Sequence, residues 1–124
     1  MKKIIVLYNM QYTLRDIHRF GVDYLMNKGY DVELWSVYEK GTRIREFICS
    51  SGYYEGNNYL KLEEEEFENS LEKNEEAVYL SYIAPTSDLM YYLLKSGNKY
   101  FMFWGLGLIY IESKEKNKKI LFKK

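Results

Sequence analysis

The chain has 124 residues, the length of one domain, and its 18 basic and 18 acidic side chains give no net charge that would steer it to nucleic acid or to an anionic membrane. Its single cysteine, Cys49, excludes an internal disulfide, and without a Cys/His cluster a structural zinc site has no ligands. No stretch approaches the ~20 apolar residues of a membrane span, and the first apolar run is too short for a signal peptide, so we expect a cytoplasmic domain.

The first third of the chain predicts a strand, a helix and a second strand. Residues 3–8 contain an unbroken apolar run, which is typical of a strand that is buried on both faces of a parallel sheet. Residues 13–28 carry apolar side chains at helical spacing, with Thr13 as the N-cap of a capping-box-like start and Gly29 as the C-terminal cap. Residues 31–37 alternate as a strand does, so the three elements form a βαβ unit with a right-handed crossover.

The middle of the chain is read as a loop followed by a helix. Residues 39–58 are rich in glycine and asparagine turn signals, and within them residues 44–49 fit either a short strand or one helical turn. Residues 60–73 predict a surface helix with a narrow apolar stripe. The glutamates at 63–66 are interpreted as the solvated face of that helix.

The last third predicts a strand, a helix and a further strand, at residues 77–83, 85–96 and 99–104. Thr86 or Ser87 is expected to cap the helix at its start, and Gly97 at its end. Residues 108–111 could add another short strand or a helical turn.

This order of elements predicts the α/β class, with a Rossmann-like, doubly wound and mostly parallel sheet of about four to five strands and helices on both faces. Residues 1–113 form that domain, and residues 114–124 are a basic C-terminal end that could be a truncated continuation. Ligands of such sheets bind beyond the carboxyl ends of the strands, at a topological switch point. Any site is therefore expected in the loops at those four ends, at residues 9–12, 37–42, 82–86 and 104–107.

The sequence lacks the residues that several familiar kinds of site require. The first turn after a strand contains no glycine fingerprint for a dinucleotide, and no P-loop occurs. His18 and Cys49 each lack a partner motif, so we identify no catalytic residue, and we expect no metal and no cofactor. An FMN-binding, flavodoxin-like domain remains an alternative, although residues 9–13 offer only one small hydroxyl side chain for a phosphate.

The aromatic and basic residues give no nucleic-acid signature. Aromatic residues make up 18% of the chain, but no basic patch is interleaved with them before Lys114. We therefore expect no nucleic-acid partner. The lysines of residues 114–124 are read as a solvated end, and they could alternatively make a peripheral contact with an anionic membrane.

Two segments resemble a known family. The opening "MKKIIVLYNMQYTLRDIHRFGVDYLMNKGYDVELWSV" and the later "AVYLSYIAPTSDLMYYLLKSGNKYFMFWGLG" resemble the N-terminal half of GT-B glycosyltransferases of bacterial polysaccharide and cell-surface sugar biosynthesis. The resemblance implies a two-domain enzyme whose N-terminal half holds the acceptor. Carried onto this chain, it implies acceptor-binding residues at Asn9, Gln11, Tyr12, Thr13, Tyr82, Thr86, Trp104, Gly105 and Gly107.

The chain departs from this family in three respects. It lacks the glycine-rich loop that many members have after the first strand, the histidine that many have near the fourth strand, and the donor-binding half. The prediction is therefore an acceptor-binding half that is not active alone, with a saccharide or lipid-linked acceptor and a donor-binding domain or subunit as partners. We expect this domain in the cytoplasm, where it could work at the inner face of the membrane. The alternatives are a small flavodoxin-like nucleotide or flavin-binding module and a non-catalytic interaction domain.

Overall fold

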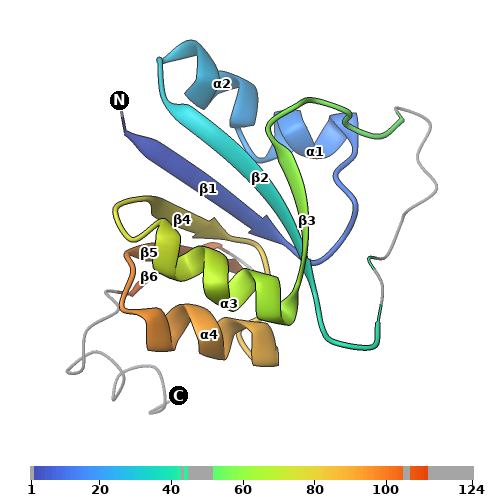
Figure 1. The fold of residues 1–124 in the computed structure, drawn as a ribbon. Coiled ribbons are helices and arrows are strands. Elements are labelled where there is room, and N and C mark those ends of the chain that lie inside the picture. Colours follow the sequence, from blue (N-terminus) through green and yellow to red (C-terminus); the bar gives the residue numbers. More distant parts are fainter. Residues whose placement is uncertain (1, 43, 45–51, 105–106, 112–124) are drawn as a thin grey trace.

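The computed structural model describes residues 2–42, 44, 52–104 and 107–111, which form one twisted sheet with helices on both sides (Figure 1). The strands are β1 (Lys3–Tyr8), β2 (Asp31–Tyr38), β3 (Tyr59–Glu63), β4 (Val78–Ser81), β5 (Tyr100–Trp104) and β6 (Gly107–Ile111). They lie in the order β3-β2-β1-β4-β5-β6; the first five are parallel, and β6 runs antiparallel to β5. This is a Rossmann-like order, so the predicted α/β fold with a doubly wound, mostly parallel sheet is confirmed.

The helices divide between the two faces of the sheet. Helices α1 (Leu14–Arg19) and α2 (Val22–Asn27) cover one face, and α3 (Glu64–Lys73) and α4 (Asp88–Ser96) cover the other (Figure 1). Strand β1 supplies both cores: Ile4 and Val6 belong to the cluster under α1 and α2, and Ile5 and Leu7 to the cluster under α3 and α4. Burial on both faces is what the unbroken apolar run of this strand predicted.

The single helix predicted for residues 13–28 is wrong in one respect, because the structure has two short helices there. Thr13 caps α1 in a capping box with Asp16, as the sequence indicated. The helix then ends at Phe20, and Gly21 takes a left-handed conformation with φ of 71°. A glycine adopts this conformation without steric cost, so the chain can turn between α1 and α2.

The helix predicted for residues 60–73 also needs correction. Its first part is strand β3, which pairs with β2 from Leu34–Tyr59 to Tyr38–Glu63, and only residues 64–73 are helical. Glu63 is both the last strand residue and the N-cap of α3, where it forms a reciprocal capping box with Glu66. Pairing with β2 is a long-range contact that local helical spacing does not report, and it decides the conformation here.

The second half of the chain follows the predicted order of strand, helix and strand. Ser87 caps α4, which begins three residues later than predicted, and Gly97 ends it with φ of 77°. Residues 108–111 belong to strand β6. Cys49, nearly all of the 44–49 segment and the 114–124 end lie outside the described residues. In the part of the chain that the structure describes, no helix has the length and hydrophobicity that a membrane crossing requires.

The strand order puts the topological switch point between β1 and β4. From β1 the chain continues to β2 on one side, and from β4 it continues to β5 on the other side. The loops after these two neighbouring strands therefore diverge, and the carboxyl ends of the strands at this point are where doubly wound sheets bind their ligands.

Tyr100 offers a test of this core. Its side chain is buried, and among the described residues its hydroxyl is the buried side-chain group without a hydrogen-bond partner. We expect Tyr100→Phe to raise the free energy of unfolding by about 1 kcal/mol, because an unpaired buried hydroxyl is removed. Tyr79→Phe is the matched control, since the Tyr79 hydroxyl donates to the Asn74 carbonyl at 3.0 Å, and it should be destabilising in the same urea titration. Equal effects of the two substitutions would contradict this account.

Candidate functional site

A row of aromatic side chains crosses the switch point. Tyr8 ends β1, Tyr82 follows β4 directly, and Phe103 lies in β5. Leu7 pairs with Ser81, and Ser81 pairs with Met102. Tyr8, Tyr82 and Phe103 are the next residues of these three neighbouring strands, so they lie at the same level of the sheet. The Tyr82 backbone N–H also donates to the Leu7 carbonyl at 2.8 Å, which holds this level in register.

Phe20, at the end of α1, completes the aromatic group. Its ring stacks on Tyr82 with a centroid distance of 3.8 Å, and Tyr82 stacks on Phe103 at 4.7 Å, both nearly parallel. Tyr8 meets the Phe20 ring edge to face at 5.2 Å. Four rings from four separate segments thus lie together at the carboxyl end of the sheet.

Arg19 adds a positive charge to these rings. Its guanidinium carbon lies 4.8 Å from the centre of the Phe20 ring, and its Nη2 donates to Asp16 Oδ1 at 2.7 Å. The Asp16 carboxylate is buried, whereas the Arg19 side chain is 52% exposed. Tyr8, Arg19, Phe20, Tyr82 and Phe103 are called the switch-point cluster from here on.

The electrostatics keep both cluster tyrosines protonated. Burial raises the pKa of Tyr8, the Asp16 charge adds to the shift, and interaction with Arg19 opposes it. Burial likewise raises the pKa of Tyr82, and the charge of Arg19 lowers it. Because the Arg19 guanidinium lowers the pKa of both hydroxyls, the three groups lie close enough to interact electrostatically.

Three of the predicted site residues are buried instead of facing a crevice. The Tyr12 hydroxyl lies 3.0 Å from the Val6 carbonyl and 3.1 Å from the Trp35 carbonyl. The Gln11 Oε1 accepts from the Tyr59 hydroxyl at 3.2 Å, and Thr13 is occupied in the cap of α1. Sequence reasoning placed these residues at the right end of the sheet but could not tell that their side chains turn inward.

The other predicted residues lie at the switch-point end. Asn9 and Thr86 are exposed, on the loops after β1 and β4. Trp104 ends β5 opposite Gly107, the first residue of β6. Gly105 lies outside the described residues. The structure therefore brings Asn9, Tyr82 and Trp104 to neighbouring strand ends, as expected.

The start of α1 is already occupied by the chain's own groups. The Thr13 N–H donates to Asp16 Oδ2, the Asp16 N–H to Thr13 Oγ1, and the Leu14 N–H to the Gly52 carbonyl. A phosphate at this turn would have to displace a buried carboxylate. This geometry disfavours an FMN phosphate at the first turn, where flavodoxin-like binding would put it.

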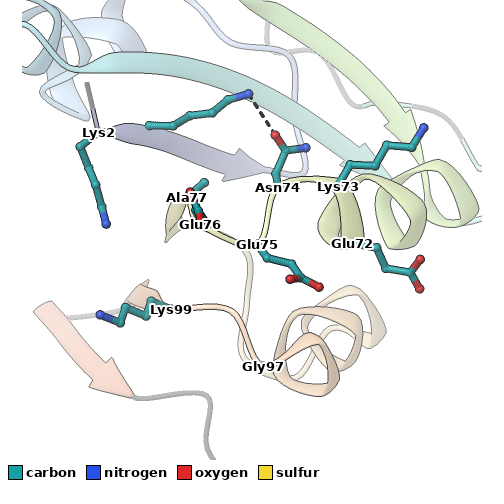
Figure 2. Close-up of a pocket in the computed structure, with 10 residues that line it drawn as sticks. Lys2, Glu72, Lys73, Asn74, Glu75, Glu76, Ala77, Gly97 and Lys99 are labelled. Atoms are coloured by element: carbon teal, nitrogen blue, oxygen red, sulfur yellow. Dashed lines mark hydrogen bonds between the residues drawn. The ribbon is translucent and has the colours of Figure 1, made fainter.

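An open groove lies at the opposite, amino end of the sheet (Figure 2). Its volume is about 800 Å³, and lysines and glutamates alternate around it. Figure 2 shows Lys99 pointing to one side of the groove and Lys73 to the other, while Lys3 is bound to Asn74 at 3.0 Å. Because the charges are mixed and do not converge, this groove is a poor candidate for a specific site.

Four residues of the switch-point cluster were not predicted, namely Tyr8, Arg19, Phe20 and Phe103. Tyr8 and Phe103 could have been found from strand alternation, which puts them on the same face as the apolar side chains two residues earlier. Arg19 and Phe20 lie at the end of α1, and their contacts with Asp16 and Tyr82 are tertiary contacts that helical spacing does not report.

The cluster has the chemistry of a binding site. Its exposed or partly exposed members, Arg19, Tyr82 and Phe103, provide two rings, a hydroxyl and a guanidinium, whereas Tyr8 and Phe20 are buried. None of the five is a carboxylate, histidine, serine or cysteine. His18, the sole histidine, has a side chain that is 87% exposed and lies 3.4 Å from Asp23. Within the described ranges, no group of three or more histidine, cysteine, aspartate or glutamate side chains is arranged to hold a metal ion.

No protein-family model, no curated protein and no solved structure matches this chain. The strand order alone defines it as a Rossmann-like α/β domain.

Proposed function

We propose that this chain is the acceptor-binding half of a sugar transferase of cell-surface polysaccharide biosynthesis, and that it is not active alone. The observation that carries the proposal is the switch-point cluster, in which stacked rings, hydroxyls and a guanidinium lie where a doubly wound sheet binds its ligands. The resemblance of the two quoted segments to GT-B N-terminal halves supports the same assignment.

A saccharide suits this combination of groups. One face of a pyranose carries C–H groups and can lie on an aromatic ring, while its rim of hydroxyls needs hydrogen-bond partners. Phe103, the partly exposed end of the stack, would provide the ring, and Tyr82 and Arg19 would provide polar contacts near it. Asn9 and Thr86, both exposed, would add contacts from the flanking loops.

In this proposal the chemical step needs a second component. The switch-point cluster holds no acid–base pair, and the donor sugar would be bound by a further domain or subunit. A lipid-linked acceptor would place the domain in the cytoplasm, against the inner face of a membrane.

A flavin or nucleotide is the second candidate, and the nearly parallel stack of three rings favours it, because a flat heterocycle stacks on such rings. The hydrogen bonds that already occupy the start of α1 disfavour a flavin or nucleotide phosphate there. FMN bound with an affinity above that of every saccharide would replace the transferase proposal.

Replacing one ring of the stack tests the proposal. We expect Tyr82→Leu to raise the Kd of the best-binding methyl glycoside by about three- to tenfold, because the ring that supports Phe103 in the stack is lost. Titrations would be followed by NMR with methyl glucoside, methyl galactoside and methyl N-acetylglucosaminide. Tyr91→Leu is the control, since Tyr91 lies on α4 on the other side of the sheet and is 60% exposed. Absence of saccharide binding to the unmodified chain, or equal effects of the two substitutions, would contradict the proposal.

A further inference from the structure

The two edge strands of the sheet differ in composition. Among the described residues, β3 and β6 are the outermost strands, and each pairs with one neighbour. Strand β3 has the sequence YLKLE, with Lys61 at its centre and Glu63 at its end. Strand β6 has the sequence GLIYI, which contains no charged residue and no proline. Charged residues and proline protect an edge strand against pairing with another chain, so β3 has this protection and β6 lacks it.

The backbone of β6 has groups that are directed away from β5. The pairing between the two strands runs from Trp104–Gly107 to Tyr100–Ile111. Successive residues of an antiparallel strand direct their N–H and C=O groups alternately to one side and to the other. About half of these groups in β6 therefore point to its outer edge, where the described part of the chain has no further strand. Such an edge is a template for a strand from another chain.

The register of β6 with β5 defines what a further strand would meet. Ile109 is opposite Met102, which belongs to the core under α3 and α4. Leu108 is opposite Phe103, one residue further along β5. Each level of the sheet therefore reaches β6 as a pair of apolar residues. Apolar residues in the added strand would match these levels best, because directly opposite side chains are the unit of sheet stabilisation.

A second copy of β6 meets this requirement. When two β6 strands are placed antiparallel about a two-fold axis at Ile109, the opposed residues are Ile109 with Ile109, Leu108 with Tyr110, and Gly107 with Ile111. No charge is opposed to a charge in this register. Opposed residues also lie an even number of positions apart along the strand, so the outward-directed backbone groups of one copy face those of the other.

We propose that β6 is the contact surface for a second copy of this chain, which adds its own β6 antiparallel about the axis at Ile109 and joins two sheets into one. A closed two-fold dimer uses the same patch on both copies, as this pairing does. The same arrangement of β3 would oppose Lys61 to Lys61 of the second copy, which disfavours it. This inference does not depend on saccharide binding.

The length of β6 sets the expected strength of the dimer. A contact between two strands of five residues is smaller than the standard protein interface of about 1,600 Å². We therefore expect a reversible dimer with a Kd on the order of 10–100 µM. Sedimentation velocity of the full chain, from about 5 to about 500 µM, should show a change from monomer to dimer, because this range brackets the expected Kd.

Charged variants at the axis test the register. Ile109→Lys and Ile109→Glu should each weaken dimerisation by about tenfold or more, because like charges are then directly opposed. An equimolar mixture of the two variants should dimerise again, because an ammonium group then meets a carboxylate. Leu60→Lys is the matched control on the other edge, at a position that is 43% exposed, and it should change the Kd by no more than about twofold. Circular dichroism checks that each variant folds.

Hydrogen exchange of the unmodified chain gives a test that needs no variant. The amides of residues 107–111 that are directed to the outer edge should exchange about threefold or more slowly at about 500 µM than at about 5 µM, because pairing protects them. The amides of residues 59–63 should exchange equally at both concentrations.

Four outcomes would overturn the inference. The first is a chain that stays monomeric up to about 500 µM. The second is a dimer that Leu60→Lys abolishes and Ile109→Lys leaves intact, which would place the contact at β3. The third is protection of residues 107–111 that is equal at both concentrations without a dimer, which would mean that the chain covers this edge itself. The fourth is a mixture of folded Ile109→Lys and Ile109→Glu chains that stays monomeric.

Discussion

Tyr12→Ala is expected to lower the free energy of unfolding by about 3–5 kcal/mol, the largest effect of any single substitution proposed for this protein. The Tyr12 side chain is completely buried, and its ring contacts those of Tyr8, Phe20 and Tyr59. Its hydroxyl ties the first turn to two carbonyls, one in β1 and one in β2. Removing the side chain leaves a cavity and two weakened carbonyl contacts, which urea unfolding followed by circular dichroism would measure.

Tyr12→Phe separates the two contributions and remains measurable if the alanine variant does not fold. It keeps the ring and removes the hydroxyl, so we expect a loss of about 1–2 kcal/mol. Tyr91→Ala, at an exposed position, should stay within about 0.5 kcal/mol of the unmodified chain. A Tyr12→Ala variant as stable as Tyr91→Ala would mean that the described packing around the first turn is wrong.

Raising the pH above 10 is expected to destabilise the fold steeply, because buried tyrosines must stay protonated in it. Burial raises the pKa of Tyr8, Tyr12, Tyr79 and Tyr100 above the ordinary value of 10.0. Below that value the hydroxyls are protonated in both states, and stability does not depend on them. Above it the unfolded chain releases protons that the folded chain retains, so stability is lost as the pH rises towards the folded-state values.

The expected slope is about 1.4 kcal/mol per pH unit for each such tyrosine, so four together can remove most of the stability of a small domain within about one to two pH units. Urea midpoints between about pH 8 and pH 11.5 would measure the loss, and tyrosinate absorbance would report ionisation in the same samples. Tyr100→Phe should reduce the pH dependence of the free energy of unfolding by about 1.4 kcal/mol per pH unit, the contribution of one tyrosine. A midpoint that is constant across pH 10 to 11 would show that these hydroxyls reach solvent.

The predicted effects of Tyr12→Ala and of high pH bear on the proposed site, because Tyr8 and Tyr12 also hold the switch-point cluster in place. Tyr12 packs against Tyr8 and Phe20, two members of the switch-point cluster. Tyr12→Phe should therefore preserve saccharide binding, whereas Tyr12→Ala should weaken it together with stability. A loss of binding in the phenylalanine variant, at unchanged ring geometry, would point to a direct role of the Tyr12 hydroxyl.

Local patterns in the sequence were enough to predict the class of fold and most of its elements. The apolar run of β1 predicted a strand buried on both faces, and Thr13, Ser87 and Gly97 marked helix ends correctly. These signals are local, since capping and alternation depend on residues within about one turn or a few strand positions. The alternation of strands and helices then led to a parallel, doubly wound sheet, and to the edge of that sheet where a site should lie.

The composition of the site was decided by tertiary structure. Pairing with β2 turned residues 59–63 into a strand, and packing of α1 on the sheet placed Phe20 against Tyr82 at the switch point. The same folding buried Tyr12, which the sequence had placed among the acceptor-binding residues. The sequence determined which strand ends meet, because hydrophobic spacing encodes strands and helices. Which side chains are exposed at those strand ends depended on contacts between residues far apart in the chain, and local spacing carries no record of those contacts.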